Sequence, residues 1–518
     1  MLLFLAILAC SLLASSLSIL DEYSISDIVS NCSTTQDEDR TSVAIIGAGL
    51  AGASVAFRAY EMFYPNSDLR LTIYERESRF GGRIHTIRPQ TEFRAALELG
   101  ATIFDTSDGC LMQLLNYVGL HHVVSGEFQH LPFKRRWTEV QPKDQVTCDV
   151  LGLSWPQDVK RLWRYGTSAW RFRNEVMSAL DKWHRFTIFP RFDTVQEAMD
   201  TLGLLPLISG NAPDYLDQVN VSREFQEEVV RPCVRARLGQ DLEEVHGLSA
   251  LIAAGSSSTA TVAGGNSRLI ERLIKLSGAH LSLSSEVIAI GRGEERRYKL
   301  TIRHGSKGSE EIEYVEYDSV VLAAPLQLLD IDLSGLGLDW NTASTANDFI
   351  EAHITHMTSP SQLITNSSYP SINISITNDD DVLTSSSPPG DMNILKVQGR
   401  DVCYFPGCPP ATGCDVCELE YLYRIHSKRA LEDAELTSML RTEYSDDILL
   451  TRISWVRRDV WPRAFSQYRG GQDFVGKFEL APRLYYTGGG EEVMTSMEMS
   501  CKMGEQVASK LVSSGSEV

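Results

Sequence analysis

The stretch that decides the fold runs from Val43 to Gly52 and reads Val-Ala-Ile-Ile-Gly-Ala-Gly-Leu-Ala-Gly. Its first four residues are apolar and predict a short buried strand. Gly47, Gly49 and Gly52 follow with Gly-x-Gly-x-x-Gly spacing, and the small and apolar residues from Ala53 to Tyr60 predict a helix. A strand that turns through such glycines into a helix is typical of a dinucleotide-binding unit, in which the pyrophosphate lies at the helix N-terminus.

A second predicted strand, Leu69 to Tyr74, completes a βαβ unit and ends at Glu75. In a dinucleotide-binding unit an acidic residue at this place takes the ribose hydroxyls of an adenosine, and its charge disfavours a 2′-phosphate. The alternative is a glycine-rich turn followed by an incidental acid. The order strand, glycines, helix, strand, acid favours the dinucleotide site.

The composition is that of a folded protein with a large core. The chain has 518 residues, of which 43% are hydrophobic and 22% charged, which excludes disordered and fibrous classes. Its length predicts two or three domains at roughly 100–200 residues each. The formal net charge of −20 repels phosphate backbones, so we expect no nucleic-acid partner.

The N-terminus indicates the secretory pathway. Residues 1–18 are apolar and end in small residues, which predicts a signal peptide; an N-terminal membrane anchor is the alternative. No later stretch approaches the length of a membrane-spanning segment. Four Asn-x-Ser/Thr sequences are candidate glycosylation sites, namely Asn31, Asn220, Asn366 and Asn373.

The cysteines fit an oxidising compartment. Removal of a signal peptide takes Cys10 and leaves nine, so one thiol should be unpaired or intermolecular. Four of the nine crowd between Cys403 and Cys417, where zinc is a possible interpretation, but the compartment favours disulfides. We expect no metal and no catalytic cysteine.

Further motifs resemble the flavin amine oxidase and glutathione-reductase-type FAD superfamily. The resemblance implies a noncovalent FAD and a Rossmann-like α/β fold assembled from discontinuous segments, with an inserted α+β substrate domain. The residues beyond the first glycine turn that it assigns to the cofactor are Arg76, Gly81, Gly82, Arg83, Gly100, Ala101, Val287, Gly490 and Glu491.

The same resemblance divides the chain into seven parts. A signal peptide (1–18) and a polar lead-in (19–40) precede three FAD-binding segments, 41–110, 256–330 and 476–518. Between these lie a mainly helical substrate or cap segment (111–255) and a second substrate segment with the cysteine-rich loop (331–475).

Four further segments are informative: 231–240, 262–269, 461–468 and, above all, Ser-Met-Glu-Met-Ser at 496–500. With these segments the chain resembles, within this superfamily, the prenylcysteine oxidase family, also known as farnesylcysteine lyase. The resemblance implies oxidative cleavage of S-prenylcysteine, farnesyl or geranylgeranyl, by molecular oxygen to cysteine, prenyl aldehyde and hydrogen peroxide. It also implies a lysosomal, vacuolar or extracellular location. The aromatic-rich segment 111–255 is expected to line the tunnel for the isoprenoid.

The catalytic side chains are less well defined by the sequence. His246 and Glu498 are weak candidates; the alternatives are a hydrogen-bonded structural histidine and a cap on the N-terminus of the last helix. Arg235 and Arg237 could hold a substrate carboxylate or be solvated at the surface.

Two other functions stay open. Tyr485 and Tyr486 could form the aromatic cage of an amine oxidase, or be plain core. A lipid-binding protein that keeps the flavin fold without turnover is the second alternative.

Overall fold

We analysed a computed structural model of the chain. It describes residues 41–63, 69–88, 96–124, 163–255, 258–305, 311–337, 349–359, 375–376, 392–403, 417–427, 429–438, 453–466, 476–491 and 493–515. The predicted signal peptide, the polar lead-in and the candidate glycosylation sites Asn31, Asn366 and Asn373 lie outside the described residues.

A six-stranded sheet forms the centre of the first part. Its strands lie in the order β18-β19-β12-β1-β2-β8, all parallel except β18. The inner strands β1, β12 and β19 are almost entirely buried, as expected when both faces of a sheet are covered, whereas the edge strand β8 is not buried. The bounds are β1 (Thr41–Ile46), β2 (Leu69–Tyr74), β8 (His280–Ser282), β12 (Ser319–Leu322), β18 (Glu479–Ala481) and β19 (Leu484–Tyr486).

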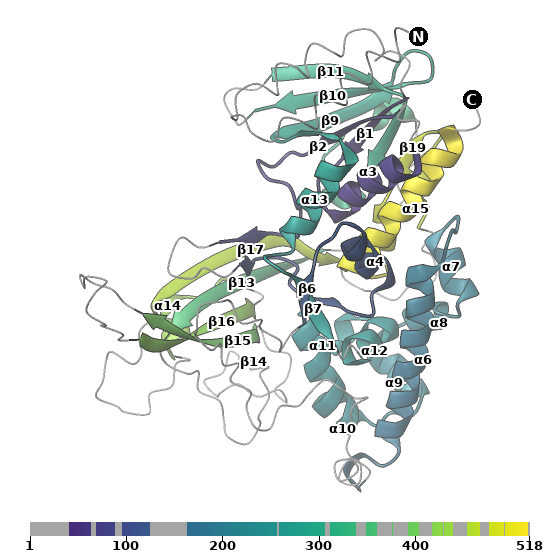
Figure 1. Ribbon diagram of the computed structural model, residues 1–518. Helices are drawn as coiled ribbons and strands as arrows, with labels where there is room; N and C mark the ends of the chain where they lie inside the picture. The colour runs from purple at the N-terminus through teal and green to yellow at the C-terminus, as the bar shows by residue number, and fades with distance from the viewer. Residues whose placement is uncertain are drawn as a thin grey trace.

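The two faces of this sheet carry different layers (Figure 1). Because side chains alternate along a strand, Val43 and Ile45 pack with the helices, whereas Ala44 and Ile46 pack with an antiparallel meander. The helices are α3 (Leu50–Phe63), α13 (Ser267–Ser277) and α15 (Met497–Gly515), and the meander strands are β9 (Ser285–Arg292), β10 (Tyr298–His304) and β11 (Glu311–Tyr317).

A helical layer forms the second part. It contains α6 (Ser168–Ile188), α7 (Val195–Thr201), α8 (Leu205–Ile208), α9 (Ala212–Gln218), α10 (Arg223–Phe225), the π-helical turn Gln226–Val230, α11 (Arg231–Leu238) and α12 (Gly247–Gly255). Several of its helices begin at side-chain caps; the Thr194 hydroxyl, for example, accepts a hydrogen bond from the Glu197 N–H.

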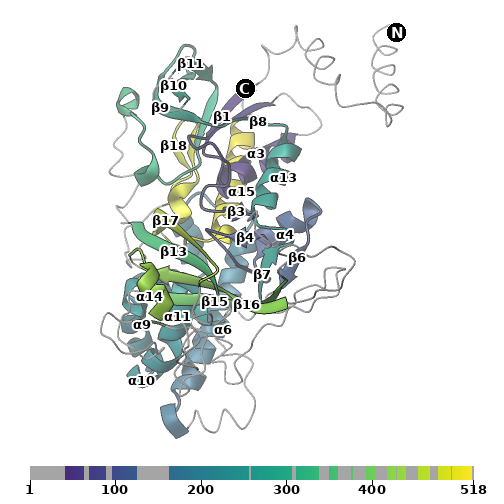
Figure 2. The ribbon, with the colours of Figure 1, turned by 90° about the vertical axis from the view of Figure 1, so that its left-hand side faces the viewer.

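The third part is a five-stranded antiparallel sheet with the order β14-β15-β16-β13-β17, seen below the six-stranded sheet in Figure 2. Its elements are β13 (Phe349–Ser359), β14 (Ser375–Ile376), β15 (Met392–Cys403), β16 (Cys417–Ser427) and β17 (Trp455–Ser466), with α14 (Asp433–Ser438) beside them. Two small sheets complete the structure. They are built from β3 (Thr86–Ile87) and β4 (Leu97–Glu98), and from β5 (Phe104–Asp105), β6 (His122–Val124) and β7 (Thr259–Val262).

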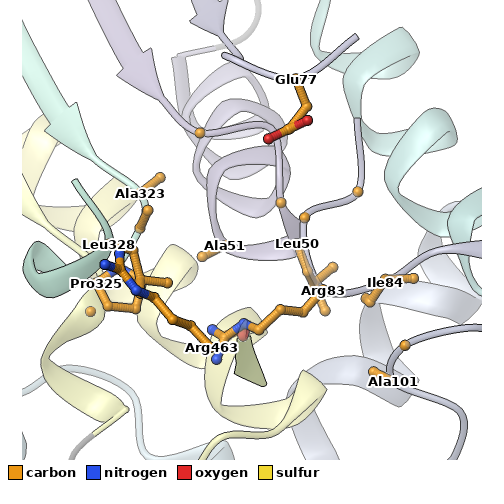
Figure 3. A pocket seen from close by; sticks show the side chains of 18 of the residues that line it. Leu50, Ala51, Glu77, Arg83, Ile84, Ala101, Ala323, Pro325, Leu328 and Arg463 are labelled. Carbon is orange, nitrogen blue, oxygen red and sulfur yellow. The ribbon is translucent and has the colours of Figure 1, made fainter. Parts of the chain in front are cut away.

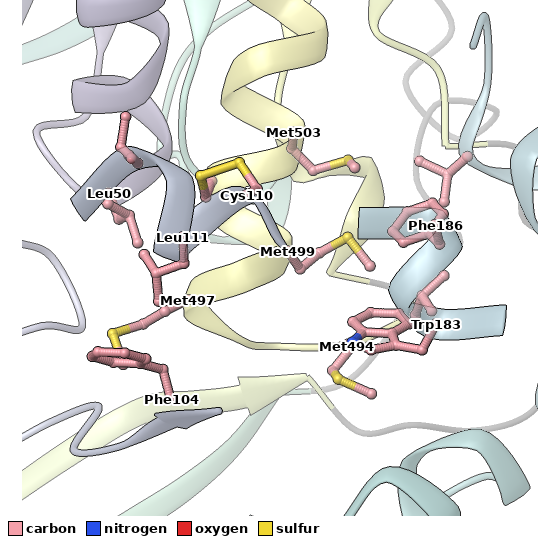
Figure 4. Packing of buried hydrophobic residues seen from close by; sticks show 14 of the residues in the cluster. Leu50, Phe104, Cys110, Leu111, Trp183, Phe186, Met494, Met497, Met499 and Met503 are labelled. Carbon is pink, nitrogen blue, oxygen red and sulfur yellow. A yellow bond between two sulfur atoms is a disulfide. The ribbon is translucent and has the colours of Figure 1, made fainter. Parts of the chain in front are cut away.

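The C-terminal segment ties these parts together. A disulfide joins Cys110 in α4 (Gly109–Tyr117) to Cys501 in α15, across a sequence separation of 391 residues. Figure 4 shows the methionines of this segment between Leu111 on one side and the aromatic rings of α6 on the other. The unbranched methionine side chain adapts to such irregular gaps, so this core joins α3, α4, α6 and α15.

Candidate functional site

One cavity of about 810 Å³ lies between the carboxyl ends of the central parallel strands and the five-stranded sheet. Its walls come from segments far apart in the chain, between residues 46 and 101, 285 and 331, 354 and 465, and 487 and 503. Figure 3 shows Glu77 at one end of the view, Ile84 and Ala101 at the other, and Leu50 and Ala51 between them. The carboxyl edge of an open α/β sheet is where ligands of such folds bind.

The glycines of the first turn have distinct structural tasks. Gly47 has φ of +111°, and a Cβ there would lie 3.0 Å from the Ala323 carbonyl oxygen. A Cβ on Gly52 would lie 2.1 Å from the Gly47 oxygen, so this position needs glycine for the close packing of α3. A Cβ on Gly49 would meet no protein atom within 4 Å, and Gly49 lines the cavity. This open cradle at the start of α3 fits a pyrophosphate.

The second glycine pair lies directly against the first turn. The Gly81 N–H donates to the Ala48 carbonyl at 2.8 Å, and Gly82, with φ of +55°, approaches Gly49 so closely that a Cβ on it would lie 3.4 Å from the Gly49 Cα. Both Gly81 and Gly82 line the cavity. The two motifs, separated in the sequence, therefore form one phosphate-sized cradle.

Glu75 stands at the end of β2 beside this cradle. Its carboxylate accepts hydrogen bonds from the Ala48 N–H at 2.9 Å and the Glu77 N–H at 3.0 Å, which fixes its position at the cavity wall. Val287 also lines this end, and Arg76 lines it from a half-exposed position. The structure thus gathers the predicted adenosine residues at one end of the cavity.

Arg83 and Glu491 meet in the middle of the cavity. Their side chains form a bidentate ion pair, and Glu491 also accepts a hydrogen bond from the Thr495 hydroxyl. Figure 3 shows Arg83 reaching across the pocket toward the segment that carries Arg463. This pair joins the first dinucleotide segment to the C-terminal one.

Gly490, a predicted cofactor residue, does not line the cavity. In the turn Gly488–Gly490, Gly488 lines the cavity, whereas a Cβ on Gly490 would lie 2.6 Å from the Met499 sulfur. Gly490 therefore faces the methionine core because the turn winds it away from the cavity, and Gly488 takes the place expected for it.

The far end of the cavity lies on the five-stranded sheet. Gly100 and Ala101 line this end of the cavity. Two side chains of the sheet hydrogen-bond to the turn that carries them. The Trp461 indole N–H donates to the Leu99 carbonyl at 3.1 Å, and the Arg424 Nη2 donates to the Gly100 carbonyl at 2.7 Å. Apolar side chains complete this wall, namely Ile354, Phe465, Met497 and Met499.

The expectation that segment 111–255 lines the tunnel was wrong for its described residues, none of which lines this cavity. Its buried aromatic side chains pack on one another, whereas Trp163 and Trp170 are exposed. Trp183 stacks on Phe186 with ring centroids 5.3 Å apart, and Phe186 contacts Phe192 at 5.6 Å. A helical spacing of aromatics predicts a buried face, but it does not say which partner covers that face.

His246 is structural and lies away from the cavity wall. It is 1% exposed; its Nε2–H donates to the Val493 carbonyl at 2.9 Å, and its Nδ1 accepts from the Ser249 N–H at 3.1 Å. A neutral imidazole can make both of these hydrogen bonds, to the Val493 carbonyl and the Ser249 N–H. Burial lowers the pKa of His246 to about 4. These contacts favour the structural alternative for His246, because its two nitrogens bind backbone groups of the core.

Glu498 is a cap, but on a helix other than its own. Its carboxylate accepts from the Cys110 N–H at 2.7 Å and the Leu111 N–H at 2.8 Å, at the N-terminus of α4. Burial raises the pKa of Glu498 to about 7, against the lowering effect of these two hydrogen bonds. The side chain is 2% exposed and does not line the cavity, so it belongs to the scaffold.

The other polar and aromatic candidates also lie away from the cavity. Arg235 is buried against the Asp241 carboxylate, and Arg237 lies on the same helix. Tyr485 is fully buried and Tyr486 nearly so, with its hydroxyl accepting from the Leu326 N–H. The last strand therefore presents neither tyrosine to the cavity.

Metal-binding clusters and membrane-spanning helices are both absent from the described residues. Within the described ranges, no group of three His, Cys, Asp or Glu side chains could hold a metal ion. Among the helices that the structure describes, none has both the length and the apolar character needed to cross a membrane.

Comparison with known proteins places the chain in a family. The model of the prenylcysteine lyase family matches residues 151–515, which is 365 of the 518 residues. The chain belongs to the prenylcysteine lyase family. A model of NAD(P)-binding Rossmann-like domains matches residues 45–118, so the prediction of a Rossmann-like α/β fold is confirmed.

Curated relatives of this prenylcysteine lyase family member are distant. A human protein named prenylcysteine oxidase 1-like is 25% identical over 297 residues, covering 55% of this chain and 56% of the relative. Farnesylcysteine lyase of Arabidopsis thaliana is 24% identical over 315 residues, covering 58% and 60%. The chain thus matches less than two thirds of the length of these relatives. A solved putrescine oxidase double mutant shares the fold, with a TM-score of 0.53 and 13% identity over 92% of this chain and all of that one.

Sequence reasoning missed Arg424 as a cavity residue. It lies in the middle of β16, within a stretch of mixed polar and apolar residues that carries no glycine motif or recognisable spacing. Its place depends on the contact between the five-stranded sheet and the Leu99–Gly100 turn, which joins residues 324 positions apart. The single arginine of Cys417–Ser427 was the available signal.

Proposed function

We propose that this protein is an FAD-dependent oxidase that cleaves the thioether of a free S-prenylcysteine. The reaction would convert the thioether, water and molecular oxygen to cysteine, a prenyl aldehyde and hydrogen peroxide. The observation that carries the proposal is one cavity that runs from a dinucleotide cradle to an apolar wall on a separate sheet. Membership of the prenylcysteine lyase family and the names of the curated relatives support the substrate class.

The residues present fit FAD at the cradle. The α3 N-terminus and Gly49 would receive the pyrophosphate, and Glu75 would take the ribose hydroxyls. Arg83 and Gly82 would lie along the second phosphate and the ribityl chain, and Gly100, Ala101 and Gly488 would face the ring system.

The chemistry needs a hydride acceptor and little acid–base catalysis. A bound FAD would accept the hydride from the allylic carbon beside sulfur and pass the electrons to oxygen. The chain would position that carbon and keep water from the isoprenoid, which suits the apolar wall of Ile354, Trp461, Phe465 and Met497. A thioether carbon needs no strong base for this step, so scaffold roles for His246 and Glu498 raise no difficulty.

We also propose that the flavin is held noncovalently. Cys501, the cysteine nearest to the C-terminal cofactor segment, is bonded to Cys110. Neither of them lines the cavity.

The amine oxidase alternative is weakened by the two tyrosines of the last strand. Tyr485 and Tyr486 lie in the core, and an aromatic cage on this strand needs them in the cavity. The cavity lining contains Trp461 and Phe465 from β17 and Tyr74 from β2, and no tyrosine of the last strand.

The deciding experiment is anaerobic reduction of the flavin. The purified, flavin-loaded protein is mixed with S-farnesylcysteine or with benzylamine while the visible flavin band is followed, with flavin-stripped protein as the control. Bleaching by the thioether alone, reversed by oxygen with release of aldehyde and peroxide, is the expected result. Bleaching by the amine alone would move the protein to the amine oxidases. A flavin that neither compound bleaches would favour the lipid-binding alternative.

A location in the secretory pathway, ending in lysosome, vacuole or medium, is part of the proposal. The Cys110–Cys501 disulfide supports an oxidising compartment. Asn220 is exposed at the end of the loop that follows α9, where a glycan has room. Treatment of the secreted wild type and of Asn220→Gln with an N-glycosidase should give a smaller mass shift for the variant.

A further inference from the structure

Arg424 is a buried cation in the cavity wall without an acid bound to it. Its side chain enters the wall from the middle strand region of the five-stranded sheet, and the residue is 6% exposed. Its Nη2 donates to the Gly100 carbonyl at 2.7 Å, whereas its Nε is shut off from solvent and has no partner among the described residues. A buried guanidinium normally has a carboxylate or phosphate partner, because its charge loses hydration.

The neighbouring acids have other partners. Glu98 is close enough to act on Arg424 electrostatically, but its oxygens accept hydrogen bonds from the Thr86 hydroxyl and the Asn266 N–H. Asp459, on β17, is held by Arg457 through two nitrogens. Among the described residues, Arg424 therefore has a carbonyl partner and no carboxylate partner.

The other cations of the cavity are arranged differently. Arg83 is paired with Glu491, and Arg79 donates to two backbone carbonyls while it lies over the Trp461 ring at 5.7 Å. Burial lowers the pKa of Arg424 to about 10, which leaves the guanidinium charged at neutral pH. Arg424 thus combines full charge, burial and an unmet donor at the cavity wall.

The position of Arg424 suits the substrate end of the cavity. It contacts Gly100, beside Trp461, on the sheet that faces the cofactor cradle. In the strand register Arg424 of β16 lies opposite His356 of β13, and His356 lies opposite Arg457 of β17. Three neighbouring strands therefore carry a polar residue at the same position along the sheet. An anion bound at Arg424 would lie next to the apolar cavity wall of Ile354, Trp461 and Phe465.

We propose that Arg424 binds the α-carboxylate of the amino-acid part of the substrate. The inference rests on the proposed function and extends it to substrate selection: a lipidated amino acid with a free carboxylate is accepted, and its ester is disfavoured. A planar carboxylate matches the paired donors of a guanidinium, and an ester has neither the charge nor the second strong acceptor. Removing one partner of such a buried pair weakens binding by about 100-fold.

The test compares two ligands on each of four proteins. S-farnesylcysteine and its methyl ester are offered to the wild type, Arg424→Gln, Arg424→Lys and Arg429→Gln; Arg429 is exposed and paired with Glu435, which makes it the matched control. Flavin content, rates of flavin reduction and calorimetric affinities are measured. Because the acid-to-ester ratio is taken within each protein, a loss of folded material cancels.

The wild type and Arg429→Gln should prefer the acid by about 100-fold, Arg424→Gln should lose the preference, and Arg424→Lys should keep part of it. A wild type that reacts equally with acid and ester overturns the inference but leaves the proposed function standing. A wild type that reduces with neither ligand refutes the proposed function, and the calorimetric ratio then decides the carboxylate site separately. An equal fall for acid and ester with a changed flavin spectrum would place Arg424 against the cofactor and overturn the inference.

Discussion

Gly49→Ala is the most direct probe of the cofactor cradle, because the folded chain has room for the added methyl group. A Cβ at this position meets no protein atom within 4 Å, and its φ lies outside the left-handed region. Replacing glycine by alanine at a compatible position stabilises a protein by about 0.4–1 kcal/mol. Alanine is a poorer N-cap than glycine by a similar amount, and Gly49 immediately precedes α3. We therefore expect the melting temperature of the flavin-free protein to stay nearly unchanged.

The same methyl group should interfere with the pyrophosphate. It would occupy the open space through which a phosphate reaches the N–H groups at the start of α3. Loss of one hydrogen bond to a charged group costs about 1.5–3 kcal/mol. At about 1.4 kcal/mol for each tenfold change, the dissociation constant of FAD should rise by roughly 10- to 150-fold. Flavin content after purification and a fluorescence titration of the flavin-free protein measure this change.

Gly210→Ala provides the matched control. A Cβ on Gly210 would also meet no protein atom within 4 Å, and Gly210 has no left-handed φ, but it lies between α8 and α9, away from the cavity. This variant should bind FAD as the wild type does. If Gly49→Ala binds FAD as tightly as Gly210→Ala, the pyrophosphate does not lie at the α3 N-terminus and the cradle has been misassigned.

Three further predictions concern the scaffold. Glu498→Gln leaves one of two buried N–H groups without an acceptor, so the free energy of unfolding should fall by about 1–3 kcal/mol and the Leu111 amide should exchange faster; unchanged exchange would contradict the cap. The pKa of His246 is lowered from 6.5 to about 4, so the stability it contributes is present above pH 6.5 and lost as the pH falls toward 4. Thermal unfolding across this window should show a loss of up to about 3 kcal/mol in the wild type and a flatter profile in His246→Asn. Replacing Cys110 and Cys501 by serine should cost about 2–4 kcal/mol and make the melting temperature less sensitive to reductant than that of the wild type, whereas an unchanged sensitivity would contradict this disulfide.

The dinucleotide unit could be predicted because its information is local. The strand expected at Leu69 to Tyr74 has these bounds in the structure, and the strand and helix around Gly47 differ from expectation by a few residues at their ends. Alternation, glycine spacing and an acid at a strand end act within one short segment. The fold class follows from such a segment even though the strand order of the sheet does not.

The cavity wall opposite the cradle could not be predicted in the same way. Arg424, Trp461 and Ile354 meet because three antiparallel strands place them beside the Leu99–Gly100 turn. Nothing in the sequence near any one of them indicates this meeting. The aromatic-rich segment 111–255 looked like a better lipid wall on composition, yet its buried aromatic residues, such as Phe172 and Phe186, belong to the core cluster that also contains residues of α15.

The Ser-Met-Glu-Met-Ser segment illustrates how one motif can serve two partners. It spans 496–500, at the start of α15, and the residues of this turn divide between two faces. Met497, Met499 and Ser500 line the cavity, whereas Glu498 and, one turn later, Cys501 hold α4. Residues three apart lie on the same face of a helix, so the cap and the disulfide act on α4 together. Because α15 carries both the cavity-lining methionines and the two attachments to α4, a motion of α4 relative to the cavity would also move Met497 and Met499. The apolar residues of the segment thus serve the cavity wall, and its acidic residue serves α4.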